Sequence, residues 1–386
     1  MPMNFNRLLA CSLLAMTLAH ARAATERLYI GTYTRDSSSV GVYTLTMDTE
    51  TGALSTPRPA AQLQDPTFLA LNPVKPVLYA TSHVAGPDGS QIGALTAFSI
   101  DPVSGDLRPL NQREIAGKSA PCYVVVDPTG RTVLDTQYNE GIVASFPVQA
   151  DGSLGPIGSL VHHAGKLGPN KERQDHPHAH SFVVSLDDRF AFACDLAMDR
   201  LVAYRLDSAR GTIVPAPELD ALANPGAGPR HSVFSKDARF LYVVTEMGGT
   251  VQVFSYEAAT GKLSPIQTVS ALPEGFKGLN TSAEICISPD GRFVYASDRG
   301  PDLIALFSRD PQTGLLTRLE QVPCGGKHPR NFALSPDGRW LVCANRDTNN
   351  LAVFRVNRDT GRLTLVSNDT QVPKAVCVLF VPPAKS

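Results

Sequence analysis

A short turn motif recurs along the chain at nearly even intervals, and this repetition constrains the fold more than any other feature. It reads SPDGR at 288–292 and again at 335–339, with degenerate copies beginning at residues 72, 127, 185 and 235. A second turn motif runs in step with it, and its glycines are Gly52, Gly105, Gly152, Gly211, Gly261, Gly314 and Gly361. Asp-Gly and Thr-Gly favour hairpin turns, because glycine accepts positive φ. The chain is therefore predicted to contain seven equivalent units.

Short β-branched and aromatic runs separate these turns, such as RFVYAS at 292–297 and LAVFRV at 351–356. About four such runs fit into each unit of roughly 50 residues, which is the pattern of a propeller blade. No long stretch has the 3.6-residue period of a helical repeat. We therefore predict an all-β fold, a seven-bladed β-propeller.

The end of the chain indicates how the propeller closes. The last apolar run, PKAVCVLFVPP at 373–383, resembles the innermost strand of the preceding unit but has no outer strands after it. The segment after residue 23 supplies three outer strands and no inner one. The C-terminal strand is therefore expected to complete the first blade, which also hides sheet edges that would otherwise be exposed.

Residues 1–23 have the pattern of a secretory signal peptide. Arg7 precedes an apolar run over 8–19, and Ala-Arg-Ala at 21–23 fits the small-x-small cleavage rule. The expected organisation is thus a signal peptide at 1–23 and a single propeller domain at 24–386. We expect a periplasmic or secreted protein that is monomeric.

The composition narrows the range of partners. The formal net charge is −1, so no basic excess favours binding to nucleic acid or to an anionic membrane surface. No segment after the signal is apolar for long enough to span a bilayer. The cysteines beyond residue 23 show no CxxC spacing, and we expect them to be free thiols.

Equivalent positions in the six internal units point to a ligand site at one mouth of the central channel. At the start of the innermost strands stand Thr67, Cys122, His180, Arg230, Ala283 and Arg330. At the end of the second strands stand His83, Tyr138, Leu196, Glu246, Arg299 and Arg346. A purely structural repeat would carry similar residues at each position, whereas these two rings concentrate His, Arg and Glu in consecutive blades. Glu284 lies one residue from the first ring, and inserts at 162–179, 221–229 and 272–282 enter the same face.

The segment HPHAHS at 176–181 places His176, His178 and His180 at alternate positions, so the three imidazoles could face one way on a strand. Neutral imidazoles suit zinc. The rings, however, contain more Arg than carboxylate, and guanidinium groups repel a cation. We expect no metal and no cofactor. The alternatives without a functional role are a solvated loop for His176 and His178, and structural ion pairs for the arginines.

Four segments carry a resemblance to a known family. PHAHS, GPRHSVF followed by VVTEM, AEICISPDGRFVYASDR and HPRNFALSPDGR resemble the bacterial seven-bladed lactonase family, which includes propeller-type 6-phosphogluconolactonases and carboxy-cis,cis-muconate cyclases. The resemblance implies an active site made of His180, Arg230, Glu246 and Arg299. His178, Arg330, Glu284, His83 and Tyr138 are the expected substrate-binding residues.

These residue types suit the hydrolysis of a lactone. The reaction needs a base for water, a cation for the oxyanion and an acid for the departing alkoxide. Glu246 or His180 can be the base and the other the acid, while Arg230 or Arg299 stabilises the oxyanion. Another Arg can bind an anionic group on the substrate. We expect a lactonase for a sugar-type, 6-phosphogluconolactone-like substrate. The alternatives are a muconate-type lactonising cycloisomerase and a non-catalytic exported propeller that binds a ligand or a protein.

Overall fold

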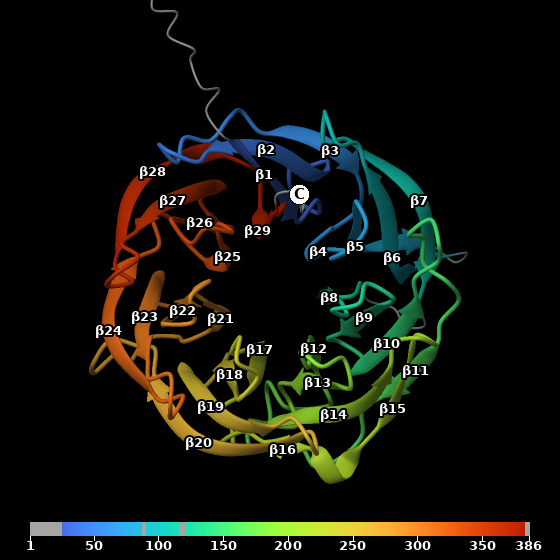
Figure 1. The fold of residues 1–386 in the computed structure, drawn as a ribbon, viewed down its shortest axis with the longest axis vertical. Coiled ribbons are helices and arrows are strands. Elements are labelled where there is room, and N and C mark those ends of the chain that lie inside the picture. The colour runs from blue at the N-terminus through green and yellow to red at the C-terminus, as the bar shows by residue number, and fades with distance from the viewer. Residues whose placement is uncertain (1–24, 87–89, 116–119, 383–386) are drawn as a thin grey trace, which may run out of the picture.

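Seven antiparallel sheets stand around a central channel in the computed structural model (Figure 1), which describes residues 25–86, 90–115 and 120–382. The predicted signal peptide lies outside these residues and stays a prediction. In each sheet the hydrogen-bonded neighbours are consecutive strands of the chain, apart from the composite first blade and one short extra strand in blade 4. The predicted seven-bladed, all-β propeller is therefore confirmed.

The strands of each blade follow the chain outward from the axis. Blades 1 to 3 comprise β29 (Ala375–Phe380), β1 (Thr25–Thr32), β2 (Gly41–Asp48) and β3 (Arg58–Gln62); β4 (Leu69–Leu71), β5 (Val77–Ala85), β6 (Gln91–Ile100) and β7 (Leu107–Glu114); β8 (Tyr123–Val126), β9 (Thr132–Gln137), β10 (Ile142–Pro147) and β11 (Ser159–His162).

Blades 4 to 7 have the same order. They comprise β12 (Ala179–Val184), β13 (Phe190–Asp195), β14 (Arg200–Asp207) and β15 (Thr212–Pro215); β17 (Pro229–Phe234), β18 (Phe240–Thr245), β19 (Thr250–Glu257) and β20 (Lys262–Ser270); β21 (Ser282–Ile287), β22 (Phe293–Asp298), β23 (Leu303–Arg309) and β24 (Leu316–Pro323); β25 (Pro329–Leu334), β26 (Trp340–Asn345), β27 (Asn350–Val356) and β28 (Leu363–Gln371).

Blade 4 departs from the four-stranded expectation. After a single turn of 3-10 helix, η1 (Pro217–Leu219), the chain forms the short strand β16 (Ala221–Leu222), which pairs with Arg200 and Leu201 at the start of β14. The 221–229 insert therefore begins on the outside of the blade, where it extends the sheet.

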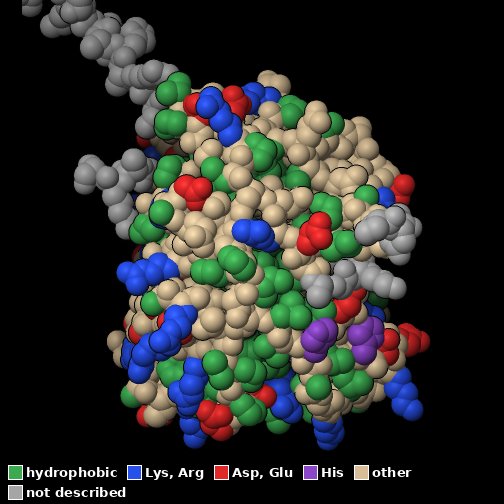
Figure 2. Space-filling view, turned by 90° about the vertical axis from the view of Figure 1, so that its right-hand side faces the viewer, with side chains coloured by type: hydrophobic (Ala, Val, Ile, Leu, Met, Phe, Trp, Pro, Cys, Tyr) green, Lys and Arg blue, Asp and Glu red, His purple; other side chains and the backbone are tan. Residues whose placement is uncertain are grey.

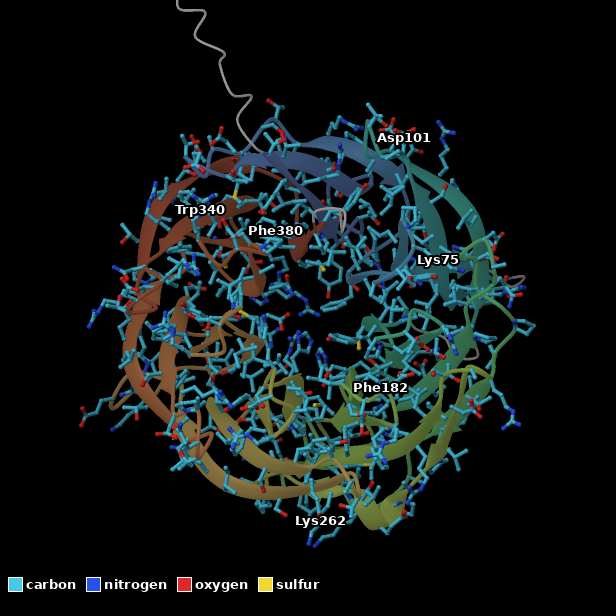
Figure 3. All side chains as sticks on the ribbon, in the orientation of Figure 1. Lys75, Asp101, Phe182, Lys262, Trp340 and Phe380 are labelled. Carbon is cyan, nitrogen blue, oxygen red and sulfur yellow. The ribbon has the colours of Figure 1, made fainter. Side chains whose placement is uncertain are left out.

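The C-terminal strand closes the ring as predicted. β29 pairs antiparallel with β1, with Leu28 opposite Phe380 and Ile30 opposite Val378. Trp340 and Phe380 belong to one buried cluster that joins blade 7 to blade 1, and Figure 3 shows both near this junction. The first blade is thus built from both ends of the described chain.

The seven turn glycines all have positive φ, between 68° and 91°. At Gly361 an added Cβ would lie 2.5 Å from Cδ1 of Phe293 in the preceding blade, so neither the backbone angle nor the space suits a larger residue. The Tyr295 hydroxyl donates to the carbonyl of Gly361 at 2.7 Å. These turns therefore also fasten each blade to the blade before it.

The core lies between the blades. The second strand of blades 3 to 7 is buried at every position, as in β22 and β26, whereas the outermost strands, such as β20, alternate between exposed and covered positions. All six cysteines that the structure describes are free thiols, as predicted, and four of them are buried. A second strand covered by two neighbouring blades has no face left for solvent, which explains why even its polar residues, such as Asp135 in β9 and Asp298 in β22, are buried.

The outer surface carries charges of both signs. Figure 2 shows Lys and Arg intermingled with Asp and Glu over the side of the molecule that faces the viewer. In the ranges that the structure describes, no helix is both long and apolar enough to cross a membrane.

Candidate functional site

A cavity of about 750 Å³ opens at the channel mouth where the innermost strands begin and the second strands end. Its wall includes six of the residues predicted from the repeat, namely His83, Tyr138, His180, Glu246, Arg299 and Arg330. Thr67, Cys122 and Arg346 from the same two rings also line it. The two sets of equivalent positions therefore meet at one mouth, opposite the SPDGR-type turns.

Glu246 is the centre of an ion-pair cluster. Its side chain is 7% exposed, and its Oε2 lies 3.0 Å from Arg230 Nε and 2.9 Å from Arg299 Nη2. Its Oε1 accepts a hydrogen bond from Arg173 Nη2 at 2.6 Å. Burial by itself raises the pKa of Glu246, but Arg299, Arg230 and Arg173 outweigh it and lower this pKa to about 2. The carboxylate is therefore ionised at neutral pH.

Arg230 lies behind Glu246 and is not part of the main cavity wall. It is 1% exposed and borders a much smaller void. Its Nη1 donates to the carbonyl of Ala283 at 2.6 Å and lies 3.1 Å from His231 Nε2. Burial and the neighbouring Arg299 and Arg330 lower the pKa of Arg230 to about 9. Its guanidinium is thus placed to hold Glu246, while Arg299 reaches the cavity itself.

Glu284 belongs to a buried chain beneath the cavity and does not line it. Its carboxylate lies 3.1 Å from His231 Nδ1, and it accepts hydrogen bonds from Asn331 Nδ2 and from the Ile285 amide. Asn331 in turn accepts from the Val378 amide of β29 at 2.7 Å. This chain connects Arg230 to blades 6, 7 and 1.

Sequence reasoning missed His231 and Asn331, although a signal exists. Each follows a ring residue, Arg230 and Arg330, just as Glu284 follows Ala283. The pairing of these innermost strands is irregular at this point, and His231, Glu284 and Asn331 form a separate hydrogen-bonded layer. A comparison of that position across the blades would have found it.

His180 is the imidazole that reaches the cavity. Its side chain is 6% exposed, and its Nε2 lies 3.9 Å from Glu246 Oε2. Its Nδ1 has no hydrogen-bond partner among the described residues. Burial, followed by Arg230 and the other cationic neighbours, holds the pKa of His180 well below its usual value. The imidazole is therefore neutral at pH 7 and can accept a proton.

The three alternating histidines do not form one metal site. His178 stacks on the ring of Tyr138, with centroids 4.2 Å apart and planes 2° apart, and it is not part of the cavity wall. A bulge at 179–181 interrupts the pairing of β12 with β13, so the simple alternation of side chains does not hold there. Within the described chain, the group with metal-ligand spacing is instead Asp175, His176 and His178.

The cavity carries an excess of positive charge. Its cationic side chains are Arg35, Arg173, Arg299, Arg330, Arg346 and Lys374, and its acidic ones are Asp36, Asp65 and Glu246. The guanidinium of Arg330 lies over the ring of Tyr33, 5.5 Å from its centroid. Neither Arg330 nor Lys374 forms a salt bridge with any described residue. An anion in this cavity would therefore meet cations that are not already neutralised.

Some of these residues could not be found from the repeat. Arg35, Arg173 and Lys374 lie in connections outside the regular strands. Of the three inserts predicted to enter the site, only 162–179 supplies a wall residue, Arg173. His83, by contrast, was found from the repeat and lines the cavity from β5, where its Nε2 is 3.0 Å from Gln91 Nε2 and its Nδ1 is 3.7 Å from Asp65 Oδ2.

Fold and site together define a propeller with a charged small-molecule cavity at one mouth, and comparison with known proteins specifies its family. The model of the family described as "Lactonase, 7-bladed beta-propeller" matches residues 27–380. The chain belongs to this family, which confirms the predicted class of enzyme, a lactonase.

Particular relatives are similar over almost the whole chain. A 6-phosphogluconolactonase of Bacillus subtilis is 39% identical over 353 residues, covering 92% of this chain and 97% of the relative. A 6-phosphogluconolactonase of Formosa agariphila is 30% identical over 80% of this chain and 86% of the relative. The solved structure of a periplasmic gluconolactonase of Pseudomonas aeruginosa is 33% identical, with a TM-score of 0.85 over 93% of this chain and 99% of that one.

Proposed function

We propose that the protein hydrolyses the cyclic ester of a sugar-type lactone that carries an anionic group, with 6-phosphogluconolactone as the reference substrate. The observation that carries the proposal is the neutral His180 beside the Glu246–Arg299 ion pair on the wall of a positively charged cavity. The names of the relatives from Bacillus subtilis and Formosa agariphila support the same substrate class.

The anionic group of the substrate is assigned to the side of the cavity formed by blade 7 and the approach to β29. Arg330 and Arg346 come from blade 7, and Lys374 immediately precedes β29. Arg346 is partly neutralised by Asp347 at 2.7 Å, which leaves Arg330 and Lys374 as the principal anion-binding groups. A guanidinium can form two hydrogen bonds to a phosphate or carboxylate, and an ammonium adds a point charge.

In the proposed mechanism His180 acts first as a base and then as an acid. It removes a proton from water, and the hydroxide adds to the lactone carbonyl carbon. Arg299 stabilises the oxyanion that develops on the carbonyl oxygen. Collapse of the tetrahedral intermediate breaks the ring C–O bond, and the imidazolium returns its proton to the departing alkoxide. The new carboxylic acid then loses a proton to solvent.

Glu246 supports this cycle as a carboxylate. A group with a pKa of about 2 does not donate a proton at neutral pH, so the acid role falls to the His180 imidazolium. The negative charge of Glu246, 3.9 Å from His180 Nε2, stabilises that imidazolium and orients Arg299. Arg230 and Arg173 keep Glu246 in place from two other directions.

We also propose that the mature protein is exported. The signal-like sequence of residues 1–23 supports this, as does the similarity to a periplasmic gluconolactonase. Cell fractionation and N-terminal sequencing of the mature chain test the proposal, and we expect the mature chain to begin at Ala24. A cytoplasmic chain that retains residues 1–23 would contradict it.

A lactone panel tests the activity. Acid release is followed by pH-stat for 6-phosphogluconolactone, gluconolactone and a muconolactone, with and without chelator, and cis,cis-muconate is included for the lactonising direction. We expect the highest kcat/KM for 6-phosphogluconolactone and no effect of chelator on kcat. Turnover of gluconolactone alone would retain the lactonase and reject the anionic substrate. No hydrolysis of any lactone would reject the proposed function.

A further inference from the structure

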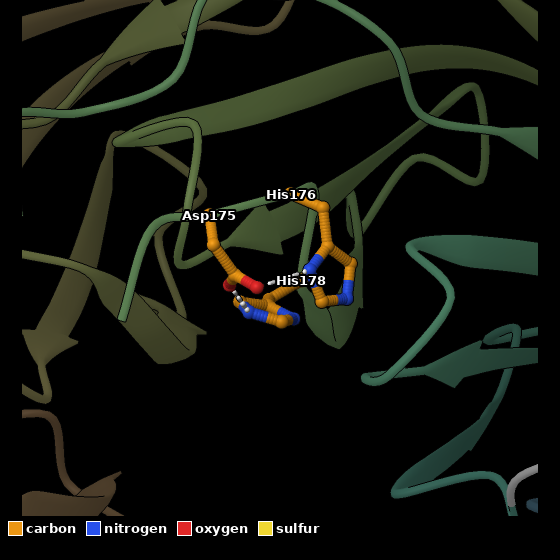
Figure 4. Close-up of side chains that lie close together, drawn as sticks. All are labelled: Asp175, His176 and His178. Atoms are coloured by element: carbon orange, nitrogen blue, oxygen red, sulfur yellow. Dashed lines mark hydrogen bonds and ion pairs between the residues drawn. The ribbon is translucent and has the colours of Figure 1, made fainter. Parts of the chain in front are cut away.

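We propose that Asp175, His176 and His178 form a binding site for one divalent transition-metal ion, with Zn²⁺ as the expected occupant, at the rim of the cavity. The site is separate from the His180–Glu246 cluster. Figure 4 shows the Asp175 carboxylate between the two imidazole rings. Two imidazoles and one carboxylate are a ligand set that binds zinc, with a fourth position left for water.

The ligand atoms already lie near the spacing that a zinc ion needs. Asp175 Oδ2 is 2.9 Å from His176 Nδ1, and Asp175 Oδ1 is 3.2 Å from His178 Nε2. One ligand atom from each of the three residues can be chosen so that all three atoms lie within 4.8 Å of one another. Bond lengths of about 2.0–2.2 Å in a tetrahedral site place ligand atoms about 3.3–3.6 Å apart. Small side-chain rotations therefore suffice to admit the ion.

The outer ring nitrogens are held in the way that metal-binding histidines require. His178 Nδ1 lies 2.9 Å from the carbonyl of Tyr138, and His176 Nε2 lies 2.7 Å from the carbonyl of Asn139. A carbonyl accepts only, so each of these nitrogens carries the N–H. In a neutral imidazole the other nitrogen then presents a lone pair, and both lone pairs point at the same carboxylate. A cation between the three groups satisfies all of them, and backbone carbonyls in this position orient zinc-binding histidines in general.

The location gives the ion a structural task. Asp175–His178 ends the 162–179 insert, which carries Arg173 to Glu246. Through the two histidines, the ion would fasten this end of the insert to the Tyr138–Asn139 carbonyls of blade 3. The Asp175 side chain is 55% exposed, and that of His178 only 7%, so one side of the site stays open to water while the other is fixed. The ion would thus hold the segment that carries Arg173 without touching the lactone.

Metal binding to the folded, substrate-free protein tests the inference. The mature chain, prepared without a polyhistidine tag and stripped with chelator, is titrated calorimetrically with Zn²⁺, Co²⁺, Mn²⁺ and Mg²⁺. We expect one Zn²⁺ per chain, weaker binding of Mn²⁺, and no binding of the hard ion Mg²⁺. Because no lactone is present, this result does not depend on the proposed function.

Three variants locate the ion. Asp175→Asn, His176→Ala and His178→Ala each remove one ligand and should weaken Zn²⁺ binding at least about tenfold. His162→Ala removes an exposed histidine at the end of β11 and serves as the matched control with unchanged binding. Asp175→Asn and His176→Ala alter exposed side chains, so their folding is not in doubt, and each is checked by thermal melting.

The same melting curves provide a second measurement. Zn²⁺ should raise Tm for the parent chain and for His162→Ala but not for the three ligand variants, because only the folded site binds the ion. The inference is overturned if the stripped parent binds no Zn²⁺ at 100-fold molar excess. It is also overturned if the ligand variants bind as tightly as the control, since Asp175 then only forms hydrogen bonds with two histidines.

Discussion

The two faces of the propeller are built from the same strands but use them differently. On the face of the SPDGR-type turns, blades repeat one arrangement: Ser288 Oγ donates to Asp290 at 2.6 Å, and Ser335 Oγ donates to Asp337 at 2.7 Å. On the cavity face, equivalent positions carry different residues, such as His180, Arg230 and Arg330. Because the same hydrogen-bonded turn recurs from blade to blade, we interpret the turn face as structural. Because equivalent positions on the cavity face carry different residues, we interpret that face as the functional one.

The contrast extends to electrostatics. Turn-face pairs such as Asp290 with Arg292 are solvent-exposed, and such pairs contribute little to stability. Glu246 is buried with three guanidinium groups, and leaving a buried charge without its partner is costly. Substitutions on the cavity face should therefore affect activity, and substitutions on the turn face should not.

The largest effect is expected from breaking the ring that carries both faces. Deletion of residues 371–386 removes β29, exposes the inner edge of β1 and opens the cluster of Trp340 and Phe380. The remaining chain should lose its cooperative thermal transition, as followed by circular dichroism. A truncated chain with an unchanged melting curve would contradict the role assigned to closure.

Removal of the charge at the centre of the cavity face is the next largest effect. Glu246→Gln keeps the shape of the side chain, but it no longer stabilises the His180 imidazolium or neutralises Arg299. We expect kcat to fall by about 100- to 10,000-fold. Because Arg230 loses its buried counter-charge as well, rates are compared below the Tm of the variant. Full turnover by the folded variant would show that the chemistry lies elsewhere.

The anion-binding side of the cavity should affect substrate binding more than turnover. Arg330→Ala and Lys374→Ala each remove a cation from the proposed phosphate site, and a charged hydrogen bond contributes about 1.5–3 kcal/mol. We expect KM for 6-phosphogluconolactone to rise about tenfold or more with little change in kcat. KM for gluconolactone is the internal control and should change little. Equal effects on both substrates would reject this placement of the phosphate.

The pH dependence should be weak near neutrality. His180 must be neutral to act as a base, and its pKa is held well below the usual value, so kcat/KM should stay flat from pH 8 to 6.5 and fall only in more acidic solution. Stability should fall in the same direction, since an unfolded histidine binds protons below about pH 6.5 that the folded one does not. An activity profile with a midpoint at or above pH 7 would contradict this environment for His180.

The smallest effect is expected on the turn face. Asp290→Ala removes the acceptor of Ser288 and Arg292 and should lower the free energy of unfolding by about 1 kcal/mol, while kcat and KM stay unchanged. Denaturant unfolding and the lactone assay measure both quantities on one preparation. A loss of activity comparable to that of Glu246→Gln would remove the distinction between the two faces.

Much of this molecule could be predicted because the repeat defines equivalent positions. The turn glycines, the blade number and the closure by β29 all follow from spacing, and the same spacing brought His180, Glu246, Arg299 and Arg330 to one mouth. The rings could not separate Arg230 and Glu284 from the cavity wall, because position along a strand does not determine depth. Arg173 and Lys374 come from connections, whose paths are not set by strand periodicity.

The sequence by itself determined the architecture. Hairpin turns, strand-like runs and a last strand without outer neighbours are each compatible with few folds, and their sevenfold repetition leaves the seven-bladed propeller. It also determined which mouth of the channel carries the charged residues. Only the tertiary structure decided their roles. Three neighbouring guanidinium groups keep Glu246 ionised in spite of its burial, burial keeps His180 neutral, and the bulge at 179–181 separates His180 from His176 and His178. These properties depend on distances between blades that no stretch of sequence contains.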